Sequence, residues 1–237
     1  MPSITTQAIV MRYTNYKEHD RILTLFSPEY GQIDVLSRGC RKPKNKLLPA
    51  SELFVTGEFV LNLSKEHYYL TSALIEDTFY PLRLDAYKLT CASYIVSLTN
   101  YTLLPCKSAS KLYALLLTAL YKLSYDNKKS LELTNEFLLL FICIVGYRPQ
   151  LSTCLKCNSE ITTNYFFNVN LGGIICDSCH ALADIPLTKK EYDWLRSVLV
   201  NGFDNENIVD NTLIFKLLRT YIETKLDVII KAGKFLP

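Results

Sequence analysis

The chain has 237 residues, of which 49% are hydrophobic and 21% are charged, and its formal net charge is +3. This composition is typical of a globular protein with one large or two ordinary domains, and it excludes a disordered or strongly basic chain. The longest apolar run, Phe137 to Val145, spans about half of a membrane. Because the N-terminus also has no secretory signal, we expect a cytoplasmic protein without a membrane partner.

Five short runs rich in β-branched and aromatic residues occupy the first 80 residues, and turn signals separate them. The runs are TTQAIVMRY, DRILTLFS, GQIDVLSR, ELFVTGEFVLNL and HYYLTSALIED. Five strands in about 80 residues favour a small closed barrel, and the five-stranded OB fold is a common barrel of this size. A two-sheet sandwich is the alternative.

From Pro81 the pattern changes to helix-spaced apolar residues with few breakers. The long helices that this pattern predicts lie within residues 82–104, 110–123 and 130–147.

Two further helices are expected near the end of the chain. A capping box at Thr188 to Glu191 begins the first, which ends at Gly202. The last helix runs from about Asn211 to Ala232, and Gly233 is well placed to end it.

Two Cys-x-x-Cys pairs with 18 residues between them form the most specific motif of the chain. Their members are Cys154, Cys157, Cys176 and Cys179. This spacing is typical of a zinc site, in which four thiolates surround the ion as a tetrahedron. The segment between the pairs suits a β-hairpin that turns at Gly172-Gly173 and would bring the pairs together. A thioredoxin-like redox pair is the competing interpretation, but it would need one pair at the start of a helix.

Four thiolates fill the coordination shell of zinc, whereas a catalytic zinc keeps one position open. His180 follows Cys179 directly and could compete for the metal, but the ligand count favours a surface histidine that is not a ligand. The motif therefore predicts a structural zinc ion, and the function is expected elsewhere.

These elements together predict an α+β multidomain protein. We expect an OB-fold nucleic-acid-binding barrel at residues 1–80 and an α-helical domain at residues 81–237. The helical domain contains the inserted four-cysteine zinc hairpin at about residues 150–184.

A cluster of cations lies between the third and fourth expected strands, in the sequence RGCRKPKNK. Its basic residues are Arg38, Arg41, Lys42, Lys44 and Lys46, and it contains no acid. Such a loop on an OB-type barrel favours contact with nucleic-acid phosphates. A merely solvated loop is the alternative, because most charge runs are of that kind.

Aromatic residues that could stack on bases are also present in the barrel. Most are expected in the core, but Tyr13 and Tyr16 are placed in a polar connection and rank highest. Enzyme motifs for phosphate loops, dinucleotides or zinc proteases do not occur. Cys40 lies among cations, which favours a thiolate, but no histidine can be paired with it. We therefore expect a protein that is not an enzyme.

Three stretches in order resemble one known family. YKEHDRILTLFSPEYGQIDVLSRGCRKPKNKL resembles the N-terminal signature of RecO, the bacterial recombination and repair protein. GYRPQLSTCLKCN with FFNVNLGGIICDSC resembles its zinc-bearing segment, and RTYIETKLDVIIKAGKFL resembles its C-terminal helix. Asn45 stands where a small hydroxyl residue is expected.

The resemblance implies a DNA repair and homologous recombination mediator that binds single- and double-stranded DNA and anneals complementary strands. It implies partnership with RecR and with single-stranded DNA-binding protein, and a role in loading RecA onto strands that the latter protein covers. It also implies a bacterial, nucleoid-associated location. DNA binding then falls on the basic loop, and Arg21 either joins that contact or braces the barrel.

Two other hypotheses remain open at this stage. The chain could be a zinc-ribbon protein-interaction module without intrinsic DNA binding, which would agree with its near-neutral charge. It could also be a thiol-dependent redox enzyme that uses the paired cysteines.

Overall fold

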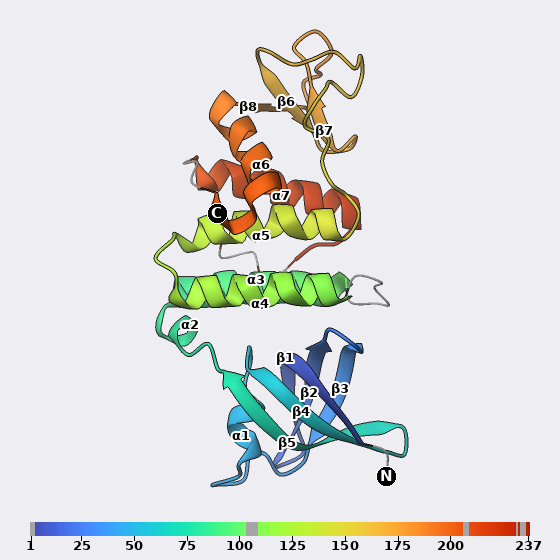
Figure 1. Ribbon diagram of the computed structural model, residues 1–237, viewed down its shortest axis with the longest axis vertical. Helices are drawn as coiled ribbons and strands as arrows, with labels where there is room; N and C mark the ends of the chain where they lie inside the picture. Colours follow the sequence, from blue (N-terminus) through green and yellow to red (C-terminus); the bar gives the residue numbers. More distant parts are fainter. Residues whose placement is uncertain (1–2, 103–108, 206–208, 231, 233–235) are drawn as a thin grey trace. The chain divides into compact units, whose positions relative to one another are not determined.

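The computed structural model describes residues 3–102, 109–205, 209–230, 232 and 236–237. The chain divides into two compact units, Met1–Asp126 and Asn127–Pro237, which we call unit 1 and unit 2 and describe separately (Figure 1). Unit 1 contains the strands of the N-terminal part together with the helices that follow them directly. The expected domain boundary at residue 80 marks the change from strands to helices and stays a prediction.

Unit 1 begins with a closed five-stranded barrel. Its strands are β1 (Ser3–Tyr16), β2 (Asp20–Ser27), β3 (Gly31–Ser37), β4 (Thr56–Ser64) and β5 (His67–Asp77). The order around the barrel is β1-β2-β3-β5-β4, and β1 closes it by pairing with both β2 and β4. The β3–β5 pair is parallel and the other pairs are antiparallel. The prediction of an OB-like barrel is confirmed, and the sandwich alternative is wrong.

The barrel is filled by apolar side chains that alternate along the strands, as the period of two requires. The buried cluster consists of Ala8, Val10, Leu23, Leu25, Ile33, Val35, Ala50, Val55, Phe59, Leu61 and Leu70. At Gly57 the neighbouring strand approaches so closely that a Cβ atom would lie 2.1 Å from the carbonyl oxygen of Leu74. Only glycine fits there, where the pairing of β4 with β5 is irregular.

The segment between β3 and β4 differs from the expectation. We expected a strand from Glu52, but the strand begins at Thr56. A short helix α1 (Leu47–Ala50) precedes it, and Phe54 adopts a left-handed conformation with φ of 70°. A bulky residue in that conformation ends regular pairing, so the chain turns before it enters the barrel.

The helices of unit 1 are α2 (Pro81–Leu84), α3 (Ala86–Thr102) and α4 (Ala109–Tyr125). The single helix expected over residues 82–104 is interrupted, because Asp85 is extended and its carboxylate accepts hydrogen bonds from the N–H groups of Tyr87 and Lys88. That carboxylate thereby caps α3. The last two residues of the expected range lie outside the described residues.

Unit 2 contains α5 (Ser130–Ile144), α6 (Lys189–Asn201), a 3-10 turn η1 (Gly202–Asp204) and α7 (Asn211–Leu226). The predicted capping box is confirmed: the backbone N–H of Thr188 donates to Glu191 Oε2 over 2.7 Å, and the N–H of Glu191 donates to Thr188 Oγ1 over 3.3 Å.

The expected end of the last helix is wrong. The helix ends at Leu226 rather than at Ala232, because Asp227 adopts the left-handed conformation with φ of 52°. The residues that follow, Val228 to Ile230, are β-branched and have weak helix propensity, and Ile230 is buried. Gly233, the expected cap, lies outside the described residues.

A small sheet with the order β7-β6-β8 completes unit 2. It consists of β6 (Tyr165–Asn168), β7 (Gly173–Ile175) and β8 (Ile185–Leu187). The hairpin between the cysteine pairs is confirmed, and β8 is an additional edge strand whose Pro186 is compatible with that position. The Tyr165 ring stacks on Tyr192 of α6 at 4.1 Å, which fixes the sheet to the helices.

Within the part of the chain that the structure describes, no helix combines the length and the apolar character needed to cross a membrane.

Candidate nucleic-acid interface and metal centre

A groove of about 480 Å³ runs along one face of the barrel. It is built from the end of β1, from β2 and β3, and from the start of β5. Its lining residues are Tyr16, Lys17, Asp20, Ile22, Asp34, Val35, Leu36, Arg38, His67, Tyr68 and Tyr69. In OB folds, the face of the second and third strands and the loops after the first and fourth strands bind oligonucleotides. The groove occupies this face of the barrel.

Cations in the groove lie against aromatic rings. The guanidinium of Arg38 lies 4.3 Å from the ring centre of Tyr69, and Nζ of Lys17 lies 5.3 Å from that of Tyr16. Such contacts hold a cation over the face of an aromatic ring. A groove of this kind can contact phosphates and offer ring faces for base stacking.

Two carboxylates also line the groove, and both are engaged in local structure. Asp20 accepts a hydrogen bond of 2.7 Å from the backbone N–H of Gly39. Asp34 accepts one of 2.8 Å from the hydroxyl of Thr24. These contacts fix the strands and the loop, but the two charges partly offset the cations in the groove.

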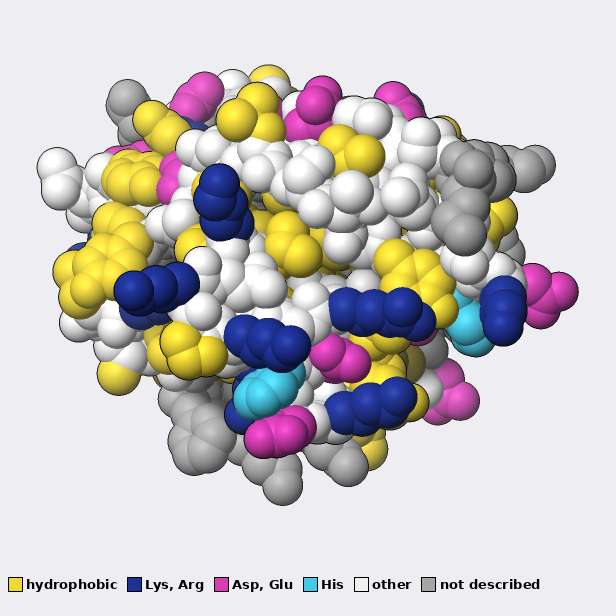
Figure 2. Space-filling view, turned by 90° about the horizontal axis from the view of Figure 1, so that it is seen from below, with side chains coloured by type: hydrophobic (Ala, Val, Ile, Leu, Met, Phe, Trp, Pro, Cys, Tyr) yellow, Lys and Arg dark blue, Asp and Glu magenta, His cyan; other side chains and the backbone are white. Residues whose placement is uncertain are grey.

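The predicted basic loop follows β3 directly, and its five basic side chains are all exposed. Arg38 is the member of this set that lines the groove, while the others, Arg41, Lys42, Lys44 and Lys46, extend the positive charge beyond it. Figure 2 shows a face of the molecule on which Lys and Arg side chains gather around hydrophobic ones. The role of the five basic-loop residues in binding DNA stays a prediction.

The loop is a defined structure rather than a loose segment. Asn45 donates from Nδ2 to the carbonyl oxygen of Gly39 over 2.8 Å and accepts from the N–H of Leu47 over 2.8 Å. This side chain therefore ties the two ends of the loop together, which explains an amide where a hydroxyl was expected. The N–H of Arg41 donates to the carbonyl oxygen of His19, so the loop is also fixed to the β1–β2 turn.

The structure corrects the expected placement of Tyr13 and Tyr16 and shows where Cys40 lies. Tyr13 and Tyr16 do not lie in a connection, because β1 continues through them and pairs with β2 as far as Asp20. Tyr16 reaches the groove, but Tyr13 packs against the barrel core. Cys40 is fully buried, so it packs in the interior and is not accessible as a nucleophile.

Arg21 braces the barrel. Its guanidinium lies 4.0 Å from the ring centre of Tyr13, pairs with Glu52 over 2.8 Å and donates to the carbonyl oxygen of Ser51. Since the side chain is only 10% exposed, these contacts leave it directed into the protein rather than toward a ligand.

Sequence reasoning did not single out Lys17 or His67, although both line the groove. A signal existed, because Lys17 lies in the turn after the first strand and His67 lies at the start of the fifth. These are the positions from which OB folds contact nucleic acid.

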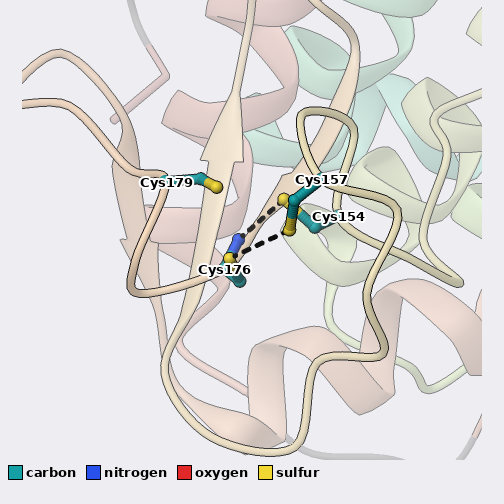
Figure 3. A group of neighbouring side chains, drawn as sticks. All are labelled: Cys154, Cys157, Cys176 and Cys179. Carbon is teal, nitrogen blue, oxygen red and sulfur yellow. Dashed lines mark hydrogen bonds between the residues drawn. The ribbon is translucent and has the colours of Figure 1, made fainter.

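In unit 2 the four predicted cysteines converge, and their Sγ atoms all lie within 4.8 Å of one another (Figure 3). A tetrahedron of sulfur ligands at 2.3 Å from a zinc ion has S···S edges of about 3.8 Å. The Sγ atoms of Cys157 and Cys176 are 3.6 Å apart, close to that edge. The arrangement therefore fits a metal ion held by Cys154, Cys157, Cys176 and Cys179.

The surroundings of these thiols favour a cation. Burial tends to raise the pKa of Cys154, but hydrogen bonds from the backbone N–H groups of Cys157, Cys176 and Lys156 lower that pKa to about 6. Hydrogen bonds with Cys176 and Cys157 raise the pKa of Cys179 to about 12, because further negative charge is unfavourable among so many sulfurs. A divalent cation would offset that repulsion.

His180 does not join the cluster. Its ring stacks on Phe166 at 4.0 Å, and its Nδ1 lies 2.6 Å from the carbonyl oxygen of Asp177. Within the described residues, the group with metal-ligand geometry consists of the four cysteines.

Comparison with known proteins shows which family the chain belongs to. The family model described as "Recombination protein O N terminal" matches residues 1–79, and "Recombination protein O C terminal" matches residues 83–232. The chain belongs to the RecO family. It is 34% identical to the DNA repair protein RecO of Acetivibrio thermocellus over 179 residues, which cover 76% of this chain and 71% of that relative. It is 26% identical to the DNA repair protein RecO of a Thermoanaerobacter species over an alignment of 249 positions, which covers all of this chain and 98% of the relative.

The two family models meet between residues 79 and 83, where the strands of this RecO-family chain end and its helices begin. The recognition made from the three sequence stretches is therefore confirmed.

Proposed function

We propose that this RecO-family protein is a DNA repair and recombination mediator that binds single- and double-stranded DNA through unit 1. The observation that supports the proposal is the groove on the β2–β3 face of an OB-like barrel, in which Lys17 and Arg38 lie over tyrosine rings. The basic loop beside it would provide further phosphate contacts. The groove offers cations and ring faces, so binding is expected to be largely independent of sequence.

Strand annealing follows from the same chemistry. Two complementary strands repel each other through their phosphates, and cations that neutralise those phosphates lower the repulsion. Since this step forms and breaks no covalent bond, we propose that the protein acts without enzymatic activity.

RecR, single-stranded DNA-binding protein and RecA are the partners that the family membership suggests. We propose that the protein cooperates with the first two to load RecA onto covered strands, in the bacterial cytoplasm near the nucleoid.

For the metal centre we propose a structural zinc ion. Cys154, Cys157, Cys176 and Cys179 would hold it, and four thiolates would fill its coordination shell. The ion would stabilise the fold of the β6–β7 hairpin and would leave the chemistry of the groove unchanged.

Fluorescence anisotropy of a labelled single-stranded oligonucleotide, titrated with the full chain at several salt concentrations, tests the proposal. We expect a log–log salt dependence with a slope of about −3 or steeper, since each neutralised phosphate contributes about −0.7. Mixing of complementary labelled strands then measures annealing. Absence of binding at low salt would contradict the proposal and favour the zinc-ribbon protein-interaction module without intrinsic DNA binding.

A further inference from the structure

A second hollow in unit 1, of about 340 Å³, lies between the end of β5 and helix α4. Its lining residues are Thr56, Glu76, Asp77, Phe79, Leu117, Thr118 and Tyr121. The hollow combines carboxylates with aromatic and aliphatic side chains, and no lysine or arginine is among the described residues that line it. We call it the acidic hollow.

Neither carboxylate of the acidic hollow forms an ion pair with a described lysine or arginine side chain. Glu76 accepts a hydrogen bond of 2.9 Å from Nε2 of Gln7, which is neutral. Asp77 accepts from the N–H of Phe79 over 2.7 Å and from the hydroxyl of Tyr125 over 2.9 Å. Glu76 is exposed to solvent, and its contact with Gln7 leaves carboxylate oxygen surface open to a ligand.

Large apolar side chains surround these charges and are open to solvent. Tyr121 is 59% exposed and its ring centre lies 5.1 Å from that of Tyr125. Leu74, two residues before Glu76 in β5, is 69% exposed. An exposed tyrosine beside a hollow, with further exposed apolar surface nearby, is typical of a protein-binding surface.

The charge of the acidic hollow decides what it can bind. Nucleic-acid phosphates would be repelled by Glu76 and Asp77, whereas a guanidinium can form paired hydrogen bonds with a carboxylate and stack on a tyrosine ring. An ammonium group could make the charge contact but not the planar fork.

We propose that the acidic hollow is the docking site for an arginine-bearing segment of a partner protein. The arginine inserts beside Glu76 and against the Tyr121 ring, and an apolar neighbour in the segment covers Leu74. This proposal does not depend on the function proposed for the groove, because the two sites use separate residues of the barrel and opposite charge.

The test uses the full chain and a fluorescein-labelled peptide, Gly-Arg-Leu-Arg-Gly-Ser, in an anisotropy titration. A second peptide replaces both arginines with citrulline, which keeps the planar shape and removes the charge. We expect the arginine peptide to bind at least about fivefold more tightly than the citrulline peptide, since a charged hydrogen-bond pair contributes more than a neutral one.

Two variants locate the site. Glu76→Gln should weaken binding of the arginine peptide about fivefold or more, and Tyr121→Ala should do so without changing the charge. The matched control is Glu66→Gln, an exposed glutamate in the turn that precedes β5, ten residues before Glu76. The control should bind like the wild type.

Equal binding by the wild type, Glu76→Gln and Tyr121→Ala would overturn the proposal, and so would equal affinity for the citrulline peptide. Tighter binding of a labelled single-stranded oligonucleotide by Glu76→Gln, with no effect on the peptide, would instead assign this face to the path of DNA. The peptide assay contains no nucleic acid, so a failure of DNA binding by the groove would leave its result unaffected.

Discussion

The contribution of the groove can be measured apart from that of the four basic-loop cations outside it by replacing Lys17 and Arg38, the two cations that lie over tyrosine rings in the groove. In a Lys17→Gln/Arg38→Gln variant the strands of the barrel should remain folded, because both side chains are exposed and neither forms a salt bridge with a described carboxylate. The variant removes two positive charges that face the groove, while Arg41, Lys42, Lys44 and Lys46 keep theirs. DNA binding by this variant therefore distinguishes DNA that lies in the groove from DNA that contacts only the remaining four cations of the basic loop.

The expected change in salt dependence follows from counting cations. If all six side chains each neutralise one phosphate of a single strand, the log–log slope is about −4.2, and it falls to about −2.8 in the double variant. Between 50 and 200 mM salt, the affinity of the wild type should then fall about 300-fold and that of the variant about 50-fold. The variant should also bind more weakly at low salt.

Anisotropy titrations with a labelled single-stranded oligonucleotide at four or five salt concentrations measure both slopes. Lys111→Gln/Lys190→Gln is the matched control, because it removes two exposed lysines that do not line the groove. Its slope should equal that of the wild type. An unchanged slope in Lys17→Gln/Arg38→Gln, with circular dichroism showing an intact fold, would refute the assignment of DNA to the groove.

The remaining predictions concern the metal centre, the barrel and the last helix. Cys154→Ser should lower the zinc content measured by mass spectrometry and expose the hairpin to proteolysis while the barrel stays folded; one zinc per chain in the variant would contradict the ligand assignment. Arg21→Ala should lower the free energy of unfolding in urea by about 2 kcal/mol, because the partly buried Glu52 loses its partner, and should leave the salt slope of DNA binding unchanged. Asp227→Gly should raise the free energy of unfolding by about 0.5–1 kcal/mol, because glycine tolerates the left-handed conformation and the change removes a negative charge from a helix C-terminus; a lower stability would refute this account.

The sequence predicts the features that depend on residues close together along the chain. The alternation of apolar residues gave the barrel strands, and the capping box at Thr188 to Glu191 gave the start of α6 to the residue. The four cysteines were found because metal ligation constrains spacing along the chain as well as distance in space.

Other features, such as the ends of β1 and α7, depend on contacts between residues far apart in the sequence, which the residue pattern does not reveal. Tyr13 reads as part of a polar connection, but its neighbours in β1 find hydrogen-bond partners in β2, and the strand continues. The last helix contains no breaker before Gly233, yet it ends at Asp227, where burial of Ile230 redirects the chain. At Tyr13 pairing between strands decides the structure, whereas at Asp227 the weak helix propensity of the following residues acts in the same direction as the burial of Ile230.

The barrel also explains how a segment without net charge can present two charged surfaces. Residues 1–80 contain nine Lys or Arg and nine Asp or Glu, so their composition predicts neither attraction to DNA nor repulsion from it. Closure of the barrel places Lys17 and Arg38 on one groove, at the start of β5, and leaves Glu76 and Asp77 at the end of the same strand. Tyr69, over whose ring Arg38 lies, is seven residues before Glu76 in β5, a separation of about 23 Å or roughly two Debye lengths at 0.1 M salt, so salt largely screens each surface from the other. The positive surface can therefore bind a phosphate backbone while the negative surface remains open to a cationic protein segment.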